Sequence, residues 1–290
     1  YDGRGMYVLS REGKYLKTIM PYPVDMPLEK IKGLRCFVTA GGRKIPIMEE
    51  QRGGFYPSMV YTPRVAPAVS KDGKIAFSGG GRVQGPARIF DLMVIGTDGS
   101  TPTGSLLGPV ISTRGGGWAA TEGVFFAVSS DDKTVYASFQ GRLVRTGWTG
   151  NEEAKPFGPE TLKDARGVAV DAKGQVYVAS AGGGKVLVLS PEGAEVRSIA
   201  VEAPDAIAVH PKSGDLYVLT VKPGAKPWDP LTGKLLKLSP EGKELAALPL
   251  PAAPKVGPTE QTTMSGRCMA LDGSAEPPLV WIGNASKDST

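Results

Sequence analysis

The stretch GVAVDAKGQVYVAS, residues 167–180, decides the fold together with KVLVLSPEGAEVRSI, residues 185–199. Each stretch contains two short runs rich in Val, Leu and Ile, and a turn that contains Gly separates them. This strand–turn–strand pattern is typical of a β-hairpin. Two successive hairpins form a four-stranded antiparallel meander, which is the composition of one propeller blade. A β-sandwich also has short strands with frequent turns, but it does not repeat one four-stranded unit.

The first hairpin of this unit recurs along the chain, and an internal repeat is the signal to seek before any motif. Its first strand carries an Ala followed by Val or Leu, and a turn rich in Gly, Asp and Lys leads to the second strand. The repeat alanines are Ala68, Ala127, Ala169, Ala208 and Ala270. The centre of the second strand is, in the same order, Ala76, Tyr136, Tyr177, Tyr217 and Trp281. The sequence therefore predicts an all-β propeller built from four-stranded antiparallel blades.

The two ends of the chain carry complementary halves of one blade. Residues 5–20, GMYVLSREGKYLKTIM, match the third and fourth strands of the unit, whereas residues 267–284 match its first and second strands. We expect the strand near Tyr7 to pair with the strand near Trp281, because such pairing removes exposed sheet edges. Residues 1–290 would then form a single closed propeller domain, even as a fragment of a longer protein.

Residues 24–65 decide between five and six blades. Within them, CFVTAGGRKIPIM at residues 36–48 has the spacing of a hairpin, with Phe37 in the column of the repeat alanines. The segment is short for four strands, and Pro46 removes a donor from the ladder. We interpret it as a degenerate sixth blade, and a five-bladed ring with an inserted hairpin is the alternative. Met26, Pro27 and residues 28–33 are expected to form one short helix, with Pro27 at its first turn and Gly33 at its end.

The composition suits a protein of strands and turns and excludes several functional classes. The chain contains 39 glycines and 25 prolines, which is more than the usual share of either residue. No apolar run approaches the roughly 18–20 residues that cross a bilayer, so no membrane span is expected. The 34 Lys and Arg against 29 Asp and Glu give a net charge of +5 without a basic stripe, so no nucleic-acid partner is expected. A single His and two Cys exclude Cys/His zinc clusters.

The unit over residues 165–250 resembles an NHL-type blade, on the strength of the two stretches quoted first. NHL-type proteins are similar to the wider group of six-bladed propellers that includes the SMP-30/gluconolactonase enzymes and the peptidylglycine lyases. The resemblance implies the propeller fold but no chemistry, because the blade motif is a packing pattern. The lyases hold zinc through several histidines, and this chain has only His210, which excludes that activity.

The lactonases of this group hold a divalent cation with Glu, Asn and Asp side chains. The whole chain has two asparagines, Asn151 and Asn284, and neither lies on a predicted inner strand. Glu122, Asp164 and Asp205 each precede an inner strand and could converge on an oxygen-rich Ca²⁺ site. Alternatively, these carboxylates are solvated in loops or cap short helices. Apart from this possible Ca²⁺ we expect no cofactor.

Charged residues occupy the position three before the repeat alanine in three successive blades: Arg166, Asp205 and Arg267. In a propeller these positions ring one mouth of the central channel, where Arg side chains could bind carboxylate, phosphate or sugar hydroxyls. The alternative is a salt-bridge network that closes the channel. His210 stands in the column that opens the turn after the first strand, so we expect it to be a turn residue without a catalytic role.

Two long insertions, residues 79–90 and 221–233, could carry recognition, because loops on a rigid scaffold commonly do. Trp228 lies among polar and Pro neighbours in the second insertion. It is a candidate platform for a sugar or a partner protein, or it packs under its own loop.

Cys36 and Cys268 would lie near the same end of neighbouring inner strands if the ring has six blades. A disulfide between them is then possible, because it requires Cα atoms within about 7 Å. The alternative is two buried thiols that act as small apolar residues.

Together these observations favour a non-catalytic propeller module for binding or assembly within a larger exported protein, in an extracellular or periplasmic location. A protein or carbohydrate partner and further domains of the same polypeptide are expected. One alternative is a metal-dependent hydrolase of the lactonase type that uses Ca²⁺. A second alternative is a structural ring in a surface layer or filament.

Overall fold

The computed structural model describes residues 6–20, 22, 26–33, 36–46, 65–78, 82–84, 87–115, 124–139, 141–150, 152–222, 232–251 and 264–286. Over these residues the chain is all-β, and its one helical element is a 3₁₀ turn at Leu28–Lys30. The predicted all-β class is confirmed. No helix in these ranges is long and apolar enough to cross a membrane.

Two compact units make up the chain. The first unit comprises Tyr1–Thr62, Pro67–Thr121 and Thr146–Ala154. The second unit comprises Pro63–Ala66, Glu122–Arg145 and Lys155–Thr290. The sequence-based expectation of one closed domain stays a prediction.

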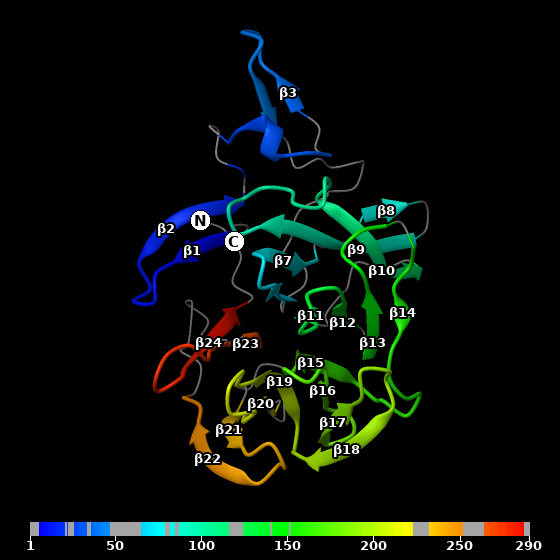
Figure 1. Ribbon diagram of the computed structural model, residues 1–290, viewed down its shortest axis with the longest axis vertical. Coiled ribbons are helices and arrows are strands. Elements are labelled where there is room, and N and C mark those ends of the chain that lie inside the picture. Colours follow the sequence, from blue (N-terminus) through cyan, green and yellow to red (C-terminus); the bar gives the residue numbers. More distant parts are fainter. Residues whose placement is uncertain are drawn as a thin grey trace, which may run out of the picture. The chain divides into compact units, whose positions relative to one another are not determined.

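Two complete four-stranded sheets lie in the second unit, drawn from green to orange in Figure 1. One sheet consists of β15 (Ala165–Val170), β16 (Val176–Ser180), β17 (Lys185–Leu189) and β18 (Glu195–Ala200). The next consists of β19 (Pro204–Val209), β20 (Leu216–Thr220), β21 (Lys234–Leu238) and β22 (Glu244–Pro249). Both are antiparallel and follow chain order, which confirms the predicted four-stranded unit.

A third sheet of the second unit follows the same plan with one addition. It consists of β11 (Val124–Val128), β12 (Val135–Phe139), β13 (Arg142–Thr146) and β14 (Lys155–Pro156), and β5 (Val65–Ala66) pairs in parallel with β11. The hairpin of β23 (Met264–Asp272) and β24 (Leu279–Ser286) completes the unit. The first strands are neighbours in chain order: β11 lies against β15, β15 against β19, and β19 against β23. In addition, β23 lies against β5.

The first unit contains one larger sheet and two hairpins. The sheet order is β10 (Leu107–Gly115), β9 (Ala87–Gly96), β7 (Lys74–Phe77) and β6 (Ala68–Val69), and β8 (Arg82–Gln84) also pairs with β9. The hairpins are β1 (Met6–Leu9) with β2 (Tyr15–Met20) and β3 (Cys36–Val38) with β4 (Lys44–Pro46). The insertion at residues 79–90 thus contributes a short hairpin, β8–β9, in addition to a loop.

The expected helix over residues 28–33 is shorter than predicted. Only Leu28–Lys30 is helical, as a single 3₁₀ turn. The backbone N–H of Lys32 donates to the Thr101 hydroxyl at 2.6 Å, and Gly33 takes a left-handed backbone conformation with φ 75°. Side-chain capture of this N–H and the reversed φ end the helix early.

Strand pairing confirms the repeat residue by residue. In every copy the repeat alanine stands opposite the predicted centre of the second strand. The pairs are Ala68 with Ala76, Ala127 with Tyr136, Ala169 with Tyr177, Ala208 with Tyr217, and Ala270 with Trp281. Five first hairpins of one design are therefore present.

Three second hairpins are built on one turn, which begins at Ser10, Ser190 or Ser239. In each, the Ser N–H donates to the carbonyl four residues later at 2.8 Å. The Gly three residues after the Ser donates back to the Ser carbonyl at 2.9 or 3.0 Å. Each hairpin also has a register shift in the two residues that end its first strand. First hairpins use the same backbone turn at Ser70 and Asp171, so the assignment of β1–β2 to the third and fourth strands of a blade stays a prediction. The pairing of β1–β2 with β24 also stays a prediction.

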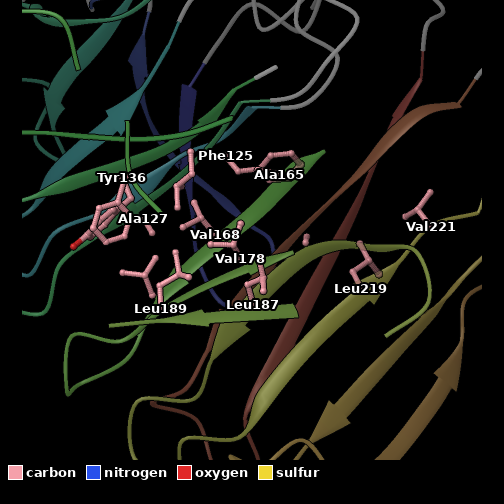
Figure 2. Packing of buried hydrophobic residues seen from close by; sticks show 14 residues of the cluster. Phe125, Ala127, Tyr136, Ala165, Val168, Val178, Leu187, Leu189, Leu219 and Val221 are labelled. Carbon is pink, nitrogen blue, oxygen red and sulfur yellow. The ribbon is translucent and has the colours of Figure 1, made fainter. Parts of the chain in front are cut away.

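Both faces of the strands β16 and β17 are buried, whereas the outer strand β18 is mostly exposed. Val168, Val178 and Leu187 pack in one cluster with Phe125 and other residues of the sheet β11–β14, as Figure 2 shows. The side chains next to them in the strands belong to a second cluster, shared with the sheet β19–β22. These side chains are Ala169, Tyr177, Val186 and Val188. Successive residues of a strand point to opposite faces, so a strand that is covered on both sides needs apolar residues at nearly every position.

Candidate functional site

The Arg166 side chain lies between two carboxylates at the start of the inner strands β15 and β19. Its Nη1 donates to Asp205 Oδ1 at 2.9 Å, and its Nη2 donates to Asp164 Oδ2 at 3.0 Å. A further, longer bond runs from Nε to Asp164 Oδ1 at 3.4 Å. Asp205 is fully buried, whereas the side chains of Arg166 and Asp164 are 34% and 44% exposed. The guanidinium therefore bridges one buried and one solvated carboxylate.

Hydroxyl groups fix the backbone that presents this cluster. The Ser138 hydroxyl, at the end of β12, donates to the carbonyl of Arg166. The Ser180 hydroxyl, at the end of β16, donates to the carbonyl of Lys163 at 2.7 Å. Between these anchors Asp164 adopts a left-handed backbone conformation with φ 48°, which Asp tolerates better than most residues. The cluster is thus held in place by the ends of two neighbouring sheets.

Gly167 permits the close approach of β15 to β19 beside the ion pair. A Cβ atom at Gly167 would lie 2.6 Å from the Cα of Ala206 and 2.8 Å from the carbonyl oxygen of Asp205. Both are backbone atoms, so the strands would have to separate to admit any side chain. This approach places the Arg166 side chain within reach of Asp205.

The electrostatics of the cluster keep Arg166 charged. Burial alone would lower the pKa of Arg166, but its hydrogen bonds to Asp164 and Asp205 raise the pKa above its ordinary value. Charge-assisted bonds of this kind are stronger than neutral ones. A guanidinium held in this way occupies the space between the two carboxylates that a cation would otherwise fill.

The structure brings together only part of the predicted site. Asp164, Arg166 and Asp205 form one cluster, which joins a candidate metal ligand, Asp164, to the predicted charged column. Arg267 lies on β23, and its side chain is outside the described residues, as is the whole of Glu122. In the described ranges no group of three His, Cys, Asp or Glu side chains could hold a metal ion. The three-carboxylate set therefore stays a prediction.

The predicted insertion at residues 221–233 is rooted at the same end of its sheet as Asp205. The backbones of Lys222 and Thr232 exchange hydrogen bonds of 2.8 and 3.0 Å, and the Lys222 ammonium contacts Glu202 at 2.6 Å. Asp205 belongs to β19, whose first residue pairs with Thr220, two positions before this root. Trp228 itself lies outside the described residues, so its role as a platform stays a prediction.

His210 is the turn residue that the repeat column indicates. Its Nδ1 accepts the backbone N–H of Ser213 at 3.1 Å, and the Ser213 hydroxyl lies 3.1 Å from the same nitrogen. Asp171 and Asp272 hold the corresponding turns of their hairpins in the same way, with Oδ1 as the acceptor. These bonds give His210 a structural role in its turn.

The possible disulfide stays a prediction, because Cys36 and Cys268 belong to different compact units. Both cysteines are partly buried. Cys36 lies in the short hairpin β3–β4 and Cys268 lies on β23. The bridge depended on the six-blade interpretation, in which the strand of Cys36 is the neighbour of β23.

Four-stranded antiparallel sheets in chain order, with their first strands as neighbours, are the blades of a β-propeller. The chain belongs to the SMP-30/gluconolactonase/LRE-like family, whose model matches residues 68–222, more than half of its length. Membership of this propeller family confirms the resemblance that the repeats indicated.

Solved structures of similar proteins include two lyases and a gluconolactonase. Virginiamycin B lyase from Staphylococcus aureus is 14% identical, with 98% of this chain and 86% of that chain covered and a TM-score of 0.46. A streptogramin B lyase is 11% identical, with coverages of 71% and 73% and a TM-score of 0.38. A gluconolactonase from Xanthomonas campestris is 15% identical, with coverages of 62% and 60% and a TM-score of 0.38. A comparison with curated proteins gave no match.

Proposed function

We propose that this chain is a non-catalytic propeller module that serves binding or assembly within a larger exported protein. The observation that carries the proposal is the position of Arg166, whose guanidinium donates to both Asp164 and Asp205. These are two of the three carboxylates that the family resemblance offers as ligands of a catalytic cation. An internal cation in this position competes with a metal ion for the same oxygens.

Displacing Arg166 would be costly. Asp205 is fully buried, and removing one partner from a buried ion pair typically costs about 3–5 kcal/mol. Arg166 is about one-third exposed, so solvent reduces this figure. A divalent cation would also have to find its remaining oxygen ligands elsewhere, since Ca²⁺ takes about six to eight.

Lactone turnover and metal binding test the proposal together. The intact chain is assayed for hydrolysis of gluconolactone with and without Ca²⁺, and its melting temperature is measured over the same Ca²⁺ range. We expect no turnover and no stabilisation by Ca²⁺. In Arg166→Met, which leaves the two carboxylates without their cation, we expect Ca²⁺ to stabilise the protein. Ca²⁺-dependent turnover by the unmodified chain, abolished in Asp205→Asn, would contradict the proposal.

The alternative function is a metal-dependent hydrolase of the lactonase type. Family membership supports it, and so does the charge of the described cluster, in which two carboxylates face one guanidinium. In that case Asp164 and Asp205, with Glu122, would hold Ca²⁺, and Arg166 would move aside when the metal binds. The titration above separates the two functions, because only the hydrolase gains both stability and activity from Ca²⁺.

We further propose that the ring has five blades and is closed by the chain ends. The support is that β23 lies against β5, which pairs with β11, so that β5, β11, β15, β19 and β23 form a circuit of neighbours. In this proposal no sixth first strand stands between β23 and β5. The hairpin β3–β4 is then an insertion, and β1–β2 supplies the outer strands of the blade that begins with β23–β24.

Deleting residues 1–20 tests closure. The deletion removes two strands from the proposed last blade and exposes the edge of β24, so we expect a large fall in melting temperature and aggregation. A deleted protein that melts like the intact chain and stays monomeric would contradict closure by these strands.

A further inference from the structure

The hairpin β3–β4 leaves both of its faces uncovered. Phe37 is 58% exposed and Val38 is 55% exposed. Because these neighbours in one strand point to opposite faces, each face of β3 carries an exposed apolar side chain. A two-stranded hairpin without a packing partner is only marginally stable in water. The fold therefore presents two large apolar side chains on a hairpin that lacks a cover.

The outer edges of the same hairpin have no partner strand among the described residues. In the described part of the chain β3 pairs only with β4, over Cys36 to Val38 and Lys44 to Pro46. An edge strand presents unpaired backbone N–H and C=O groups that can form a ladder with another extended chain. The hairpin thus offers both backbone hydrogen bonds and apolar contacts to one extended binding partner.

Positive charge is concentrated around this hairpin. Residues 28–46 contain five Lys and Arg residues but only one acidic residue, Glu29, in a chain with a net charge of +5. Lys32, Arg43 and Lys44 are exposed. Lys44 stands opposite Val38 in the register, and neither Lys32 nor Lys44 forms an ion pair with a described residue. A partner that covers the hairpin therefore meets cations at its rim.

We propose that the β3–β4 hairpin is a docking surface for an extended acidic segment of a protein partner, which adds a strand to the hairpin. This inference rests on the proposed binding function and names its partner class. Strand addition takes its affinity from main-chain hydrogen bonds and its specificity from pockets for alternate side chains. Phe37 and Val38 receive the apolar side chains of the segment, while Lys44 and its neighbours pair with its carboxylates.

An anionic membrane is a less favoured partner, because the turn of the hairpin lacks large apolar side chains. Insertion into a bilayer surface needs large apolar side chains at the part that enters it. The turn between the strands is Thr39-Ala40-Gly41-Gly42, which contains none. Phe37 and Val38 lie within β3 instead, where a paired strand can cover them.

Peptide binding to the intact chain tests the proposal. The probe is a fluorescent ten-residue peptide that alternates Val with Glu, and its anisotropy is followed as the chain is added. We expect the affinity to fall as the salt concentration rises, because salt screens the attraction between the exposed Lys side chains and the peptide carboxylates. A peptide with Lys in place of Glu should not bind, and N-methylation of alternate backbone amides should abolish binding by blocking the ladder. Binding that is indifferent to N-methylation would overturn strand addition.

Variants locate the surface. The double variant Phe37→Ser with Lys44→Glu should weaken peptide binding at least tenfold, whereas Leu245→Ser should not change it. Leu245 is a matched control because it is 51% exposed on the edge strand β22. Equal loss in both variants, or no binding of the acidic peptide by the intact chain, would overturn the proposal.

Two further measurements separate the rival outcomes. We expect Phe37→Ser to melt within about 2 °C of the intact chain, since exposed substitutions have small effects. A fall of many degrees would show that Phe37 packs inside the ring and would overturn the proposal. Binding of phosphatidylserine vesicles in place of the peptide would also overturn it. The lactone assay tests only the cluster of Asp164, Arg166 and Asp205. Failure of the proposed function is therefore distinguishable from failure of the docking surface on β3–β4.

Discussion

The sheet β15–β18 and the hairpin β3–β4 are both made of short antiparallel strands, yet their surroundings are opposite. Val186 and Val188, on β17, are fully buried in one cluster, and Leu187 between them is 1% exposed in another. In the hairpin, Phe37 and Val38 are each more than half exposed. Apolar residues at successive positions therefore mark a covered sheet in one case and an uncovered one in the other.

The difference arises from what lies beside each element. The sheet β15–β18 stands between two sheets of the same design, and its first strand lies against both β11 and β19. The hairpin β3–β4 has no third or fourth strand in the described part of the chain. Neighbouring copies of the unit cover the sheet β15–β18, whereas no neighbouring sheet covers β3–β4 among the described residues.

The largest effect should come from truncating the doubly covered sheet. Leu187→Ala removes a fully packed side chain and should lower the free energy of unfolding by about 2–5 kcal/mol. Phe37→Ala, in the uncovered hairpin, should change it by about 0.5 kcal/mol or less. Urea unfolding followed by circular dichroism measures both. Similar losses in the two variants would mean that the hairpin is packed as tightly as the blade.

A smaller effect should follow from adding one methyl group to a glycine. Gly167→Ala forces apart the backbones of β15 and β19 and should cost about 1–3 kcal/mol, as overpacking does. Gly41→Ala, in the turn of β3–β4, meets nothing within 4 Å and should be neutral or slightly stabilising. Thermal unfolding of the two variants decides the matter. A harmless Gly167→Ala would contradict the close approach of the strands.

The ion pair at the start of the inner strands should contribute about 1–2 kcal/mol, because solvent around Arg166 screens part of a buried pair. Asp205→Asn should lower the free energy of unfolding by about this amount, and Asp164→Asn by less, since Asp164 is exposed. A double-mutant cycle with Arg166→Met isolates the coupling. A coupling free energy of zero between Arg166 and Asp205 would contradict a stabilising role for the pair.

The repeat and its register could be predicted from the sequence because both depend on local patterns. Ala169 opposite Tyr177, and the same pair in the other copies, follow from strand spacing and turn residues alone. The role of Asp164 could not be predicted in this way. It depends on a left-handed φ of 48° and on the approach that Gly167 allows, so the sequence indicated only a loop or cap carboxylate or a possible metal ligand, and no bond to Arg166.

Strand alternation could not have found the Asp164–Arg166 contact, because Asp164 precedes β15 and takes a left-handed backbone conformation. The Ser138 hydroxyl that fixes Arg166 was missed for a different reason, because its partner is a backbone carbonyl 28 residues away. The number of blades depends likewise on a contact between segments far apart in sequence, β23 and β5.

The smallest effect concerns the turns. The hydrogen bond from the Ser239 hydroxyl lowers the pKa of Glu241, and its contribution is lost as pH falls through that lowered pKa. Ser239→Ala should therefore raise the pKa of Glu241 toward its ordinary value. The turn of β3–β4 places Gly41 where this turn has Glu241, so Gly41→Glu should create a carboxyl with a lowered pKa beside Thr39. NMR titration measures both, and unchanged titration of Glu241 would contradict the bond.

The central claim is that the covered blades and the hairpin β3–β4 differ in stability, as expected if the hairpin lies outside the repeat that we propose. Native-state hydrogen exchange of the intact chain tests it most directly, because protection reports how much structure must open at each amide. We predict that amides of β16 and β17 exchange only by global unfolding, whereas amides of β3 and β4 exchange by local opening, at least a hundredfold faster. Equal protection of the two regions would show that the hairpin belongs to the ring, and would contradict both the five-blade proposal and the docking surface.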